Sequence, residues 1–165
     1  MKAVALMIAL AMPALALAKP APVKKKTVLF VCTGNFYRSR FAQAMFNEQE
    51  PKTWTAISRG LDASTPRKTN VSPLVSAELA RRHVSESRVE GTPTQLTQAD
   101  LDHADLVVLM DGAEHTPMLK AKFPSVPAEK LRSWSVKDVP KTPAPQAFDE
   151  IAADVTKLID ELQKQ

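Results

Sequence analysis

Short apolar runs alternate with longer amphipathic segments along most of this chain. The apolar runs have the length and composition of buried strands, and they lie at residues 28–31, 54–58, 105–110 and 130–134. The amphipathic segments repeat apolar residues at helical spacing, and they lie at residues 39–50, 74–83, 98–103, 113–123 and 146–163. Strands that alternate with helices form a parallel sheet with helices packed against it. The pattern therefore predicts an α/β fold, a single domain with a central parallel four-stranded sheet flanked by helices on both faces.

Capping and turn residues mark the ends of several of these helices. Ser72 followed by Pro73 is typical of a helix start, because serine can accept a bond from a backbone N–H and proline fits the first helical position. Thr97 is expected to cap the short third helix. Pro117 is compatible with the fourth helix if it lies in the first turn. Residues 84–96 show no period, so we expect irregular structure there.

The loop between the first predicted strand and the first predicted helix, residues 32–39, has the residue types of an oxyanion site. Gly34 and Asn35 tolerate the left-handed dihedrals that a tightly curled loop needs. Backbone N–H groups and the positive end of the next helix then point into the curl, and Arg38 can bind two oxygens of a tetrahedral anion. The same field favours a Cys32 thiolate, which would be a nucleophile facing the anion. The predicted phosphate-binding residues are Thr33, Gly34, Asn35, Phe36, Tyr37, Arg38 and Ser39.

The first residues of the chain are typical of a secretory signal peptide. Lys2 precedes an almost wholly apolar stretch, and Ala16-Leu17-Ala18 is a small-x-small cleavage site. We therefore expect residues 1–18 to be a signal peptide cleaved after Ala18, with an uncleaved anchor as the alternative. Residues 19–26 are expected to form an extended linker, and residues 27–165 the folded domain. The protein is then exported, to the periplasm or beyond, and free of the membrane after cleavage.

Charge and cysteine usage restrict the possible partners of the domain. The chain has 22 basic and 18 acidic residues, a net charge of +4, and no basic stretch interleaved with aromatic residues. Nucleic-acid binding is therefore not expected. Cys32 is the single cysteine, so an internal disulfide is impossible and the thiol is a candidate reactive group. The three histidines, His83, His103 and His115, have no metal-ligand spacing, and we expect no metal, no cofactor and a monomer.

The segment 31–39 (Val-Cys-Thr-Gly-Asn-Phe-Tyr-Arg-Ser) resembles the signature loop of the low-molecular-weight protein tyrosine phosphatases, which share their fold with thioredoxin-coupled arsenate reductases. The resemblance extends, at weaker identity, over most of residues 27–165. It implies that Asn35 and Ser58 hold the loop conformation and that Ser39 hydrogen-bonds the thiolate. It also implies that Asp138, in a loop after the last strand, is the general acid and then the base. Asp111, after the third strand, is the alternative acid.

Several positions depart from the family pattern. Tyr37 replaces a second cysteine that can protect the nucleophile from oxidation, and Arg40 replaces a proline. Gly91 lies about where the family has a histidine that braces the loop, and Val139-Pro140 follow Asp138 in place of proline and aromatic residues. Phe36 and Tyr37 either form a substitute wall of the cleft or support the loop from within. Arg67 and Lys68 either favour an acidic substrate or are a solvated turn.

These residues leave three possible functions. The first is a phosphatase that hydrolyses phosphotyrosine or small aryl phosphate esters through a phosphocysteine intermediate, so that its partner is a phosphorylated protein or a small phosphate ester. The second is arsenate reduction, which in thioredoxin-coupled relatives requires further cysteines that this chain lacks. The third is an oxyanion-binding module with weak or no catalysis.

Overall fold

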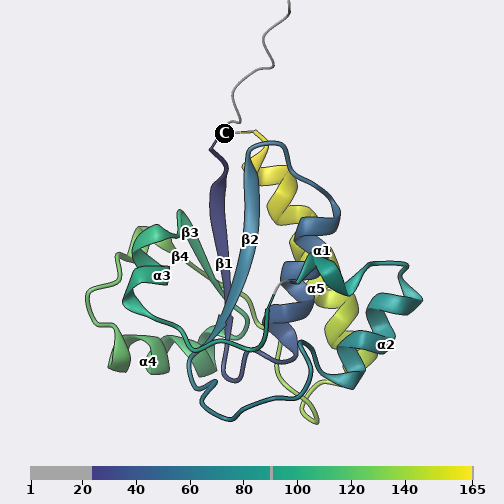
Figure 1. Cartoon of the computed structure of the whole chain (residues 1–165). Helices are drawn as coiled ribbons and strands as arrows, with labels where there is room; N and C mark the ends of the chain where they lie inside the picture. The colour runs from purple at the N-terminus through teal and green to yellow at the C-terminus, as the bar shows by residue number, and fades with distance from the viewer. Residues whose placement is uncertain (1–23, 90, 165) are drawn as a thin grey trace, which may run out of the picture.

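The computed structural model describes residues 24–89 and 91–164, and its centre is a four-stranded sheet (Figure 1). The strands lie in the order β2-β1-β3-β4, and every neighbouring pair is parallel. Their bounds are β1 (Lys26–Cys32), β2 (Trp54–Gly60), β3 (Leu106–Leu109) and β4 (Leu131–Ser133). The predicted central parallel four-stranded sheet is confirmed.

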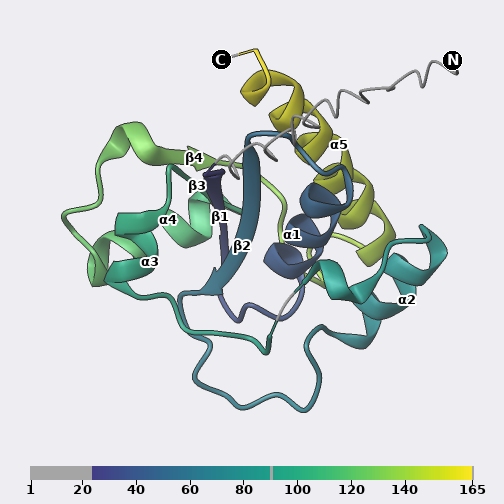
Figure 2. The ribbon, with the colours of Figure 1, turned by 45° about the horizontal axis from the view of Figure 1, so that its top comes forward.

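Helices cover both faces of this sheet, as Figures 1 and 2 show from two directions. One face carries α1 (Arg38–Glu48), α2 (Pro73–Arg81) and α5 (Ala144–Leu162). The other face carries α3 (Gln98–His103) and α4 (Gly112–Lys122). Two short 3₁₀ helices, η1 (Glu86–Arg88) and η2 (Ala128–Lys130), lie in the connections. Helices on both faces were predicted, and this prediction is also confirmed.

The apolar run of β1 is continuous because both of its faces are buried. Val28 and Phe30 point into the core beneath α1 and α5, whereas Leu29 and Val31 point into the core beneath α3 and α4. All four side chains are fully buried. A central strand of a parallel sheet has no solvent-facing side, so it cannot alternate apolar with polar residues. Trp54, at the start of β2, is likewise part of the core.

The predicted helix starts at Ser72 and Thr97 are present. The Ser72 hydroxyl accepts a hydrogen bond from the Val75 N–H at 3.3 Å, and Thr97 forms a reciprocal capping box with Asp100. The prediction that Pro117 lies in the first turn of its helix is wrong. The Asp111 carboxylate caps α4 at the Ala113 N–H, so the helix begins at Gly112 and Pro117 falls in its second turn.

The N-terminal predictions lie mostly outside the described residues. The signal peptide at residues 1–18 and residues 19–23 of the linker are not described, and Lys26, the last residue of the predicted linker, already belongs to β1. Among the helices of residues 24–89 and 91–164, none combines the length and the apolar character that crossing a membrane requires.

Candidate active site

The loop that joins β1 to α1, here called the anion loop (residues 32–39), lies at the carboxyl edge of the sheet. Asn35 adopts the left-handed conformation, with φ of 48°, and this turns the chain sharply. Gly60, at the end of β2, allows the loop to pack closely, because a Cβ at that position would lie 2.8 Å from the Thr33 carbonyl oxygen. Parallel sheets bind ligands at this edge, so the fold itself places the loop where a ligand site is expected.

A buried and neutral hydrogen-bond network fixes the curl of the anion loop from within. The Asn35 amide donates to the Ser39 hydroxyl at 3.0 Å and to the Ser58 hydroxyl at 2.9 Å, and its oxygen accepts from the Thr94 N–H at 2.9 Å. Ser58 in turn donates to the Gln43 side chain at 2.7 Å. Asn35, Ser39, Gln43 and Ser58, here called the inner network, are all buried.

The sulfur of Cys32 lies beside this network. The Cys32 Sγ is 3.0 Å from the Ser39 Oγ, and the side chain is 3% exposed. The Ser39 oxygen already accepts a hydrogen bond from Asn35, so its own hydrogen is free to point at the sulfur. A hydroxyl donor at this distance stabilises a negative charge on sulfur more than it stabilises a neutral thiol.

Arg38 is buried at the start of α1 and carries the positive charge of the site. Its Nη1 donates to the Val136 carbonyl oxygen at 3.1 Å, and its Nη2 donates to the Asp138 Oδ2 at 3.0 Å. Both Nη atoms also lie 3.3 Å from the Glu114 Oε2. The Nε is buried and has no hydrogen-bond partner among the described residues. A buried guanidinium N–H without a partner is the kind of donor that an oxyanion can satisfy.

Glu114 and His115, in the first turn of α4, belong to the site although no sequence argument selected them. Thr33 Oγ donates to the Glu114 Oε1 at 2.6 Å and lies 3.2 Å from the His115 Nε2. The His115 Nδ1 accepts from the Asp111 N–H at 3.0 Å, which places the imidazole proton on Nε2, facing Thr33. Their position just beyond β3, at the same sheet edge as Cys32, is the signal that would have found them.

The protonation states of these two residues follow from their surroundings. Burial and the nearby Arg38 charge lower the pKa of His115 to about 4, so the ring is neutral near pH 7. Partial burial would raise the pKa of Glu114, but the Thr33 hydroxyl and the Arg38 guanidinium outweigh it and lower that pKa. Glu114 is therefore a carboxylate near neutral pH.

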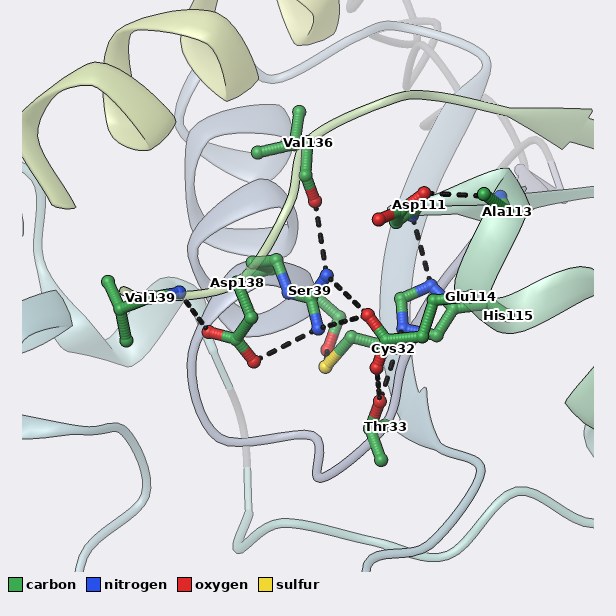
Figure 3. Close-up of polar contacts among 11 residues, drawn as sticks. Cys32, Thr33, Ser39, Asp111, Ala113, Glu114, His115, Val136, Asp138 and Val139 are labelled. Atoms are coloured by element: carbon green, nitrogen blue, oxygen red, sulfur yellow. Dashed lines mark hydrogen bonds and ion pairs between the residues drawn. The ribbon is translucent and has the colours of Figure 1, made fainter. Parts of the chain in front are cut away.

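The two candidate acids differ in what their carboxyl groups contact. Asp138 is half-exposed; its Oδ2 accepts from Arg38 and its Oδ1 from the Val139 N–H at 2.9 Å. Asp111 is buried, and its carboxylate accepts from the Ala113 N–H as the cap of α4. Figure 3 shows Asp138 and Glu114 on either side of the Cys32 sulfur in this view, whereas Asp111 points away toward Ala113. The structure thus brings Asp138 into contact with Arg38 of the anion loop, which also holds Cys32, and leaves Asp111 with a helix-capping contact.

Phe36 and Tyr37, adjacent in the anion loop, have different environments. Tyr37 is buried and its ring packs edge-on against Phe148 of α5, with centroids 5.1 Å apart, so it supports the loop from within. Burial and the Asp138 charge raise the pKa of Tyr37 to about 12. Phe36 is partly exposed, and the Arg67 guanidinium lies 4.7 Å from its ring centroid, a cation–π contact.

Two departures from the family pattern contact each other. The Arg40 side chain, buried in α1, donates from its Nη2 to the Gly91 carbonyl oxygen and from its Nε to the Asn70 carbonyl oxygen at 2.9 Å. Gly91 has φ of 68°, the left-handed region that favours glycine. Arg40 thus ties two connecting segments to the start of α1, beside the anion loop.

Metal binding has no support in the described residues. In residues 24–89 and 91–164 no three His, Cys, Asp or Glu side chains gather as a metal-binding group. His115 is occupied by its contacts to Asp111 and Thr33, and His103 is exposed on α3 with its Nδ1 2.6 Å from the Ala99 carbonyl oxygen.

The sequence model of the low molecular weight phosphotyrosine protein phosphatase family matches residues 27–165 of this chain. The chain belongs to this family. The fold and the anion loop after β1 agree with the resemblance found in the sequence, which is confirmed.

Individual relatives include both phosphatases and arsenate reductases. The chain is 30% identical, over 82% of its length and 92% of the relative's, to a probable low molecular weight protein-tyrosine-phosphatase, EpsP, of Ralstonia solanacearum. It is 34% identical, over 53% of its length and 60% of the relative's, to arsenate reductase 1 of Bacillus cereus. Among solved structures, the low molecular weight protein tyrosine phosphatase of T. tengcongensis superimposes with a TM-score of 0.67 at 28% identity, covering 85% of this chain and 99% of that one. Membership therefore supports a cysteine-dependent phosphatase or an arsenate reductase.

Proposed function

We propose that this protein is a phosphomonoesterase that hydrolyses phosphotyrosine or small aryl phosphate esters through a phosphocysteine intermediate. The observation that carries the proposal is the convergence of Cys32, Arg38 and Asp138 at the anion loop, with the Arg38 Nε buried and without a partner among the described residues. A nucleophile, an anion receptor and an acid are the parts that this reaction requires.

In the first proposed step the Cys32 thiolate attacks phosphorus. The bond from phosphorus to the ester oxygen breaks, its electron pair goes to that oxygen, and protonated Asp138 supplies the proton. The N–H groups of the anion loop and the Arg38 guanidinium hold the remaining phosphoryl oxygens. The Ser39 hydroxyl, 3.0 Å from the sulfur, stabilises the thiolate before attack.

In the second proposed step water replaces the sulfur. Asp138, now a carboxylate, accepts a proton from the attacking water as a bond forms between the water oxygen and phosphorus. The bond between phosphorus and sulfur breaks, which releases inorganic phosphate and regenerates the Cys32 thiolate and the protonated acid. One carboxyl group therefore serves both steps and ends in its starting state.

Arsenate reduction is the alternative that the relatives raise. In that reaction electrons must pass from thiols to the bound oxyanion, and the relay in thioredoxin-coupled enzymes uses several cysteines. This chain has only Cys32. The phosphatase reaction needs no second thiol, and for this reason we favour it over arsenate reduction.

The experiment measures p-nitrophenyl phosphate turnover by the wild-type protein and by Cys32→Ser. We expect the substitution to reduce turnover by at least about 10⁴-fold while binding of inorganic phosphate survives. Turnover that is unchanged in Cys32→Ser would exclude Cys32 as the nucleophile. A wild-type protein that binds phosphate without turnover would instead be an oxyanion-binding module, and arsenate reduction with a thiol donor would favour the alternative enzyme.

Export is part of the proposal and rests on the sequence of residues 1–18. A cleaved signal peptide would place a monomeric enzyme in the periplasm or outside the cell, where it meets phosphorylated proteins or small phosphate esters. Mass spectrometry of the protein recovered from the periplasmic fraction would give a mature N-terminus at Lys19. An intact N-terminus in the cytoplasmic fraction would contradict export.

A further inference from the structure

Glu114, on α4, contacts two residues of the anion loop, Thr33 and Arg38, that the proposed reaction assigns to the oxyanion. Its Oε1 accepts from the Thr33 hydroxyl at 2.6 Å, and its Oε2 lies 3.3 Å from both Nη atoms of Arg38. Figure 3 shows this carboxylate extending from α4, with a dashed line joining it to the Thr33 hydroxyl. An internal carboxylate thus binds the guanidinium that the oxyanion needs.

Arg38 does not depend on Glu114 for its position. The guanidinium is 1% exposed and is held at 3.1 Å by the Val136 carbonyl oxygen and at 3.0 Å by Asp138. Both contacts are shorter than the 3.3 Å contacts to Glu114. Glu114 is therefore better described as a competitor for Arg38 than as its support.

The balance of charge around Glu114 is unfavourable for a dianion. Arg38 supplies one positive charge, and the groups that oppose it are the Glu114 and Asp138 carboxylates and, when ionised, the Cys32 sulfur. His115 is neutral near pH 7 and contributes no charge. Asp111, at the start of α4, is another acidic residue and does not offset this negative charge. A tetrahedral dianion placed on Arg38 would therefore meet an excess of negative charge in a partly desolvated site.

We propose that Glu114 competes with the oxyanion for Arg38 and takes up a proton when the oxyanion binds. The proton comes from solvent, and the Thr33 hydroxyl keeps the neutral carboxylic acid in place, where its O–H donates to an anion oxygen. Glu114 is then a specificity-determining residue that makes the site bind dianions more tightly as the pH falls. This proposal rests on the oxyanion site of the proposed function, and it adds a coupling between oxyanion binding and proton uptake by Glu114.

The test measures sulfate binding by titration calorimetry, because sulfate is a tetrahedral dianion that does not itself titrate near neutral pH. All proteins carry Cys32→Ser, which removes the thiol as a source of protons. The protein with this substitution alone is the parent. Affinities are compared between about pH 5.5 and 7.5, in buffers of different ionisation enthalpy that report proton uptake. We expect the parent to take up close to one proton, and its affinity to rise severalfold per pH unit of acidification.

Glu114→Gln keeps the shape of the side chain and removes its charge. We expect it to bind sulfate at least about tenfold more tightly at pH 7.5 than the parent and to lose most of the proton uptake. Asp138→Asn, which leaves Glu114 in place, is expected to retain the linked proton. The control is Glu48→Gln, because Glu48 is exposed to a similar degree and also pairs with an arginine. Its Oε2 lies 2.7 Å from the Arg88 Nε, and this pair is away from the anion loop. Glu48→Gln should leave sulfate binding unchanged.

Weaker or equal sulfate binding by Glu114→Gln at pH 7.5 overturns the proposal, and so does a proton uptake that Glu114→Gln leaves unchanged. The proton uptake of the Cys32→Ser parent is a second measurement that does not depend on how the Glu114→Gln variant folds: sulfate binding without proton uptake in the parent also overturns the proposal. If none of the proteins binds sulfate, the oxyanion site itself has failed, and this outcome is distinct from sulfate binding without linkage.

Discussion

The two sides of the anion loop differ in charge and in burial. The inner network of Asn35, Ser39, Gln43 and Ser58 is buried, uncharged and hydrogen-bonded throughout. The opposite side, here called the charged mouth, consists of Arg38, Glu114 and Asp138, with the two carboxyl side chains 38% and 45% exposed. The inner network fixes one loop geometry, whereas the mouth can change its charge when a ligand arrives.

This difference has a physical basis. Neutral donors and acceptors can be buried at little cost when each finds a partner, and a fully satisfied network is rigid. Buried charges are costly unless paired, and Arg38 is paired by groups that keep partial access to water. Catalysis needs both properties, because the sulfur must be held in place while protons move at the mouth.

Among substitutions that compare the two sides, the largest effect is expected from breaking the inner network at Asn35. Asn35→Ala removes the donor to Ser39 and Ser58 and the acceptor for Thr94, and it leaves an alanine in the left-handed region. We expect the free energy of unfolding to fall by about 3 to 4 kcal/mol. We also expect phosphatase turnover to fall more than about 100-fold, because the loop donors lose their alignment. Urea unfolding and p-nitrophenyl phosphate assays measure the two effects.

Asn47 provides a matched control for this substitution. Its side chain also makes three hydrogen bonds, to the Ala56 N–H and to the carbonyl oxygens of Ala56 and Arg88, but it lies on α1 away from the anion loop. Asn47→Ala should lower stability while leaving turnover within about threefold of the wild type. Equal loss of turnover in both variants would mean that stability, and not loop geometry, controls the rate.

At the charged mouth, Asp138→Asn is expected to slow hydrolysis mainly for esters whose leaving oxygen must be protonated. An amide cannot protonate the leaving oxygen, so hydrolysis of esters with poor leaving groups should slow by about 100-fold. Good leaving groups such as p-nitrophenolate need less assistance, and their turnover should fall by less than about tenfold. The measurement is the dependence of kcat/KM on the pKa of the leaving phenol.

Asp111→Asn distinguishes Asp138 from the alternative acid. The Asp111 carboxylate caps α4 and is buried, and an asparagine amide oxygen can accept the same hydrogen bond, so the replacement should preserve the cap without changing the dependence on the leaving group. A steeper dependence in Asp111→Asn than in Asp138→Asn would reverse the assignment of the acid.

Much of the inner side of the site was predictable because most of its residues lie close together in the sequence. Cys32, Asn35 and Ser39 lie within one short segment whose residue types and spacing limit the loop to few conformations, and Ser58 follows from the family resemblance. The sheet was predictable for a similar reason, since β1 contains, and β3 consists of, an uninterrupted apolar run. Helix ends were less certain, as Asp111 and Pro117 show, because a single side-chain cap moves a boundary.

The charged mouth was harder to predict because its contacts span long distances in sequence. Arg38 is separated from Glu114 by 76 positions and from Asp138 by 100. Near the start of α1, Arg40 meets Gly91 across 51 positions, and no periodicity reports such a pair. Glu114 also looks like an ordinary acidic residue in the first turn of a helix. Only the packing of α4 beside the loop gives it a second role.

His115 lies beside Thr33 and next to Glu114 of the charged mouth, and it gives the smallest effect. The pKa of His115 is lowered to about 4 by burial and by the Arg38 charge, so the unfolded chain binds this proton at higher pH than the folded protein does. The stability that depends on a neutral His115 is complete above about pH 6.5 and is lost as the pH falls toward 4. We expect a loss on the order of 2 kcal/mol across this window, and His115→Asn should flatten that part of the curve. Urea unfolding at several pH values measures it, with the exposed His103→Asn as the control. A curve for His115→Asn that parallels the wild type would show that other groups carry the acid sensitivity and that His115 does not stabilise the mouth through its neutral form.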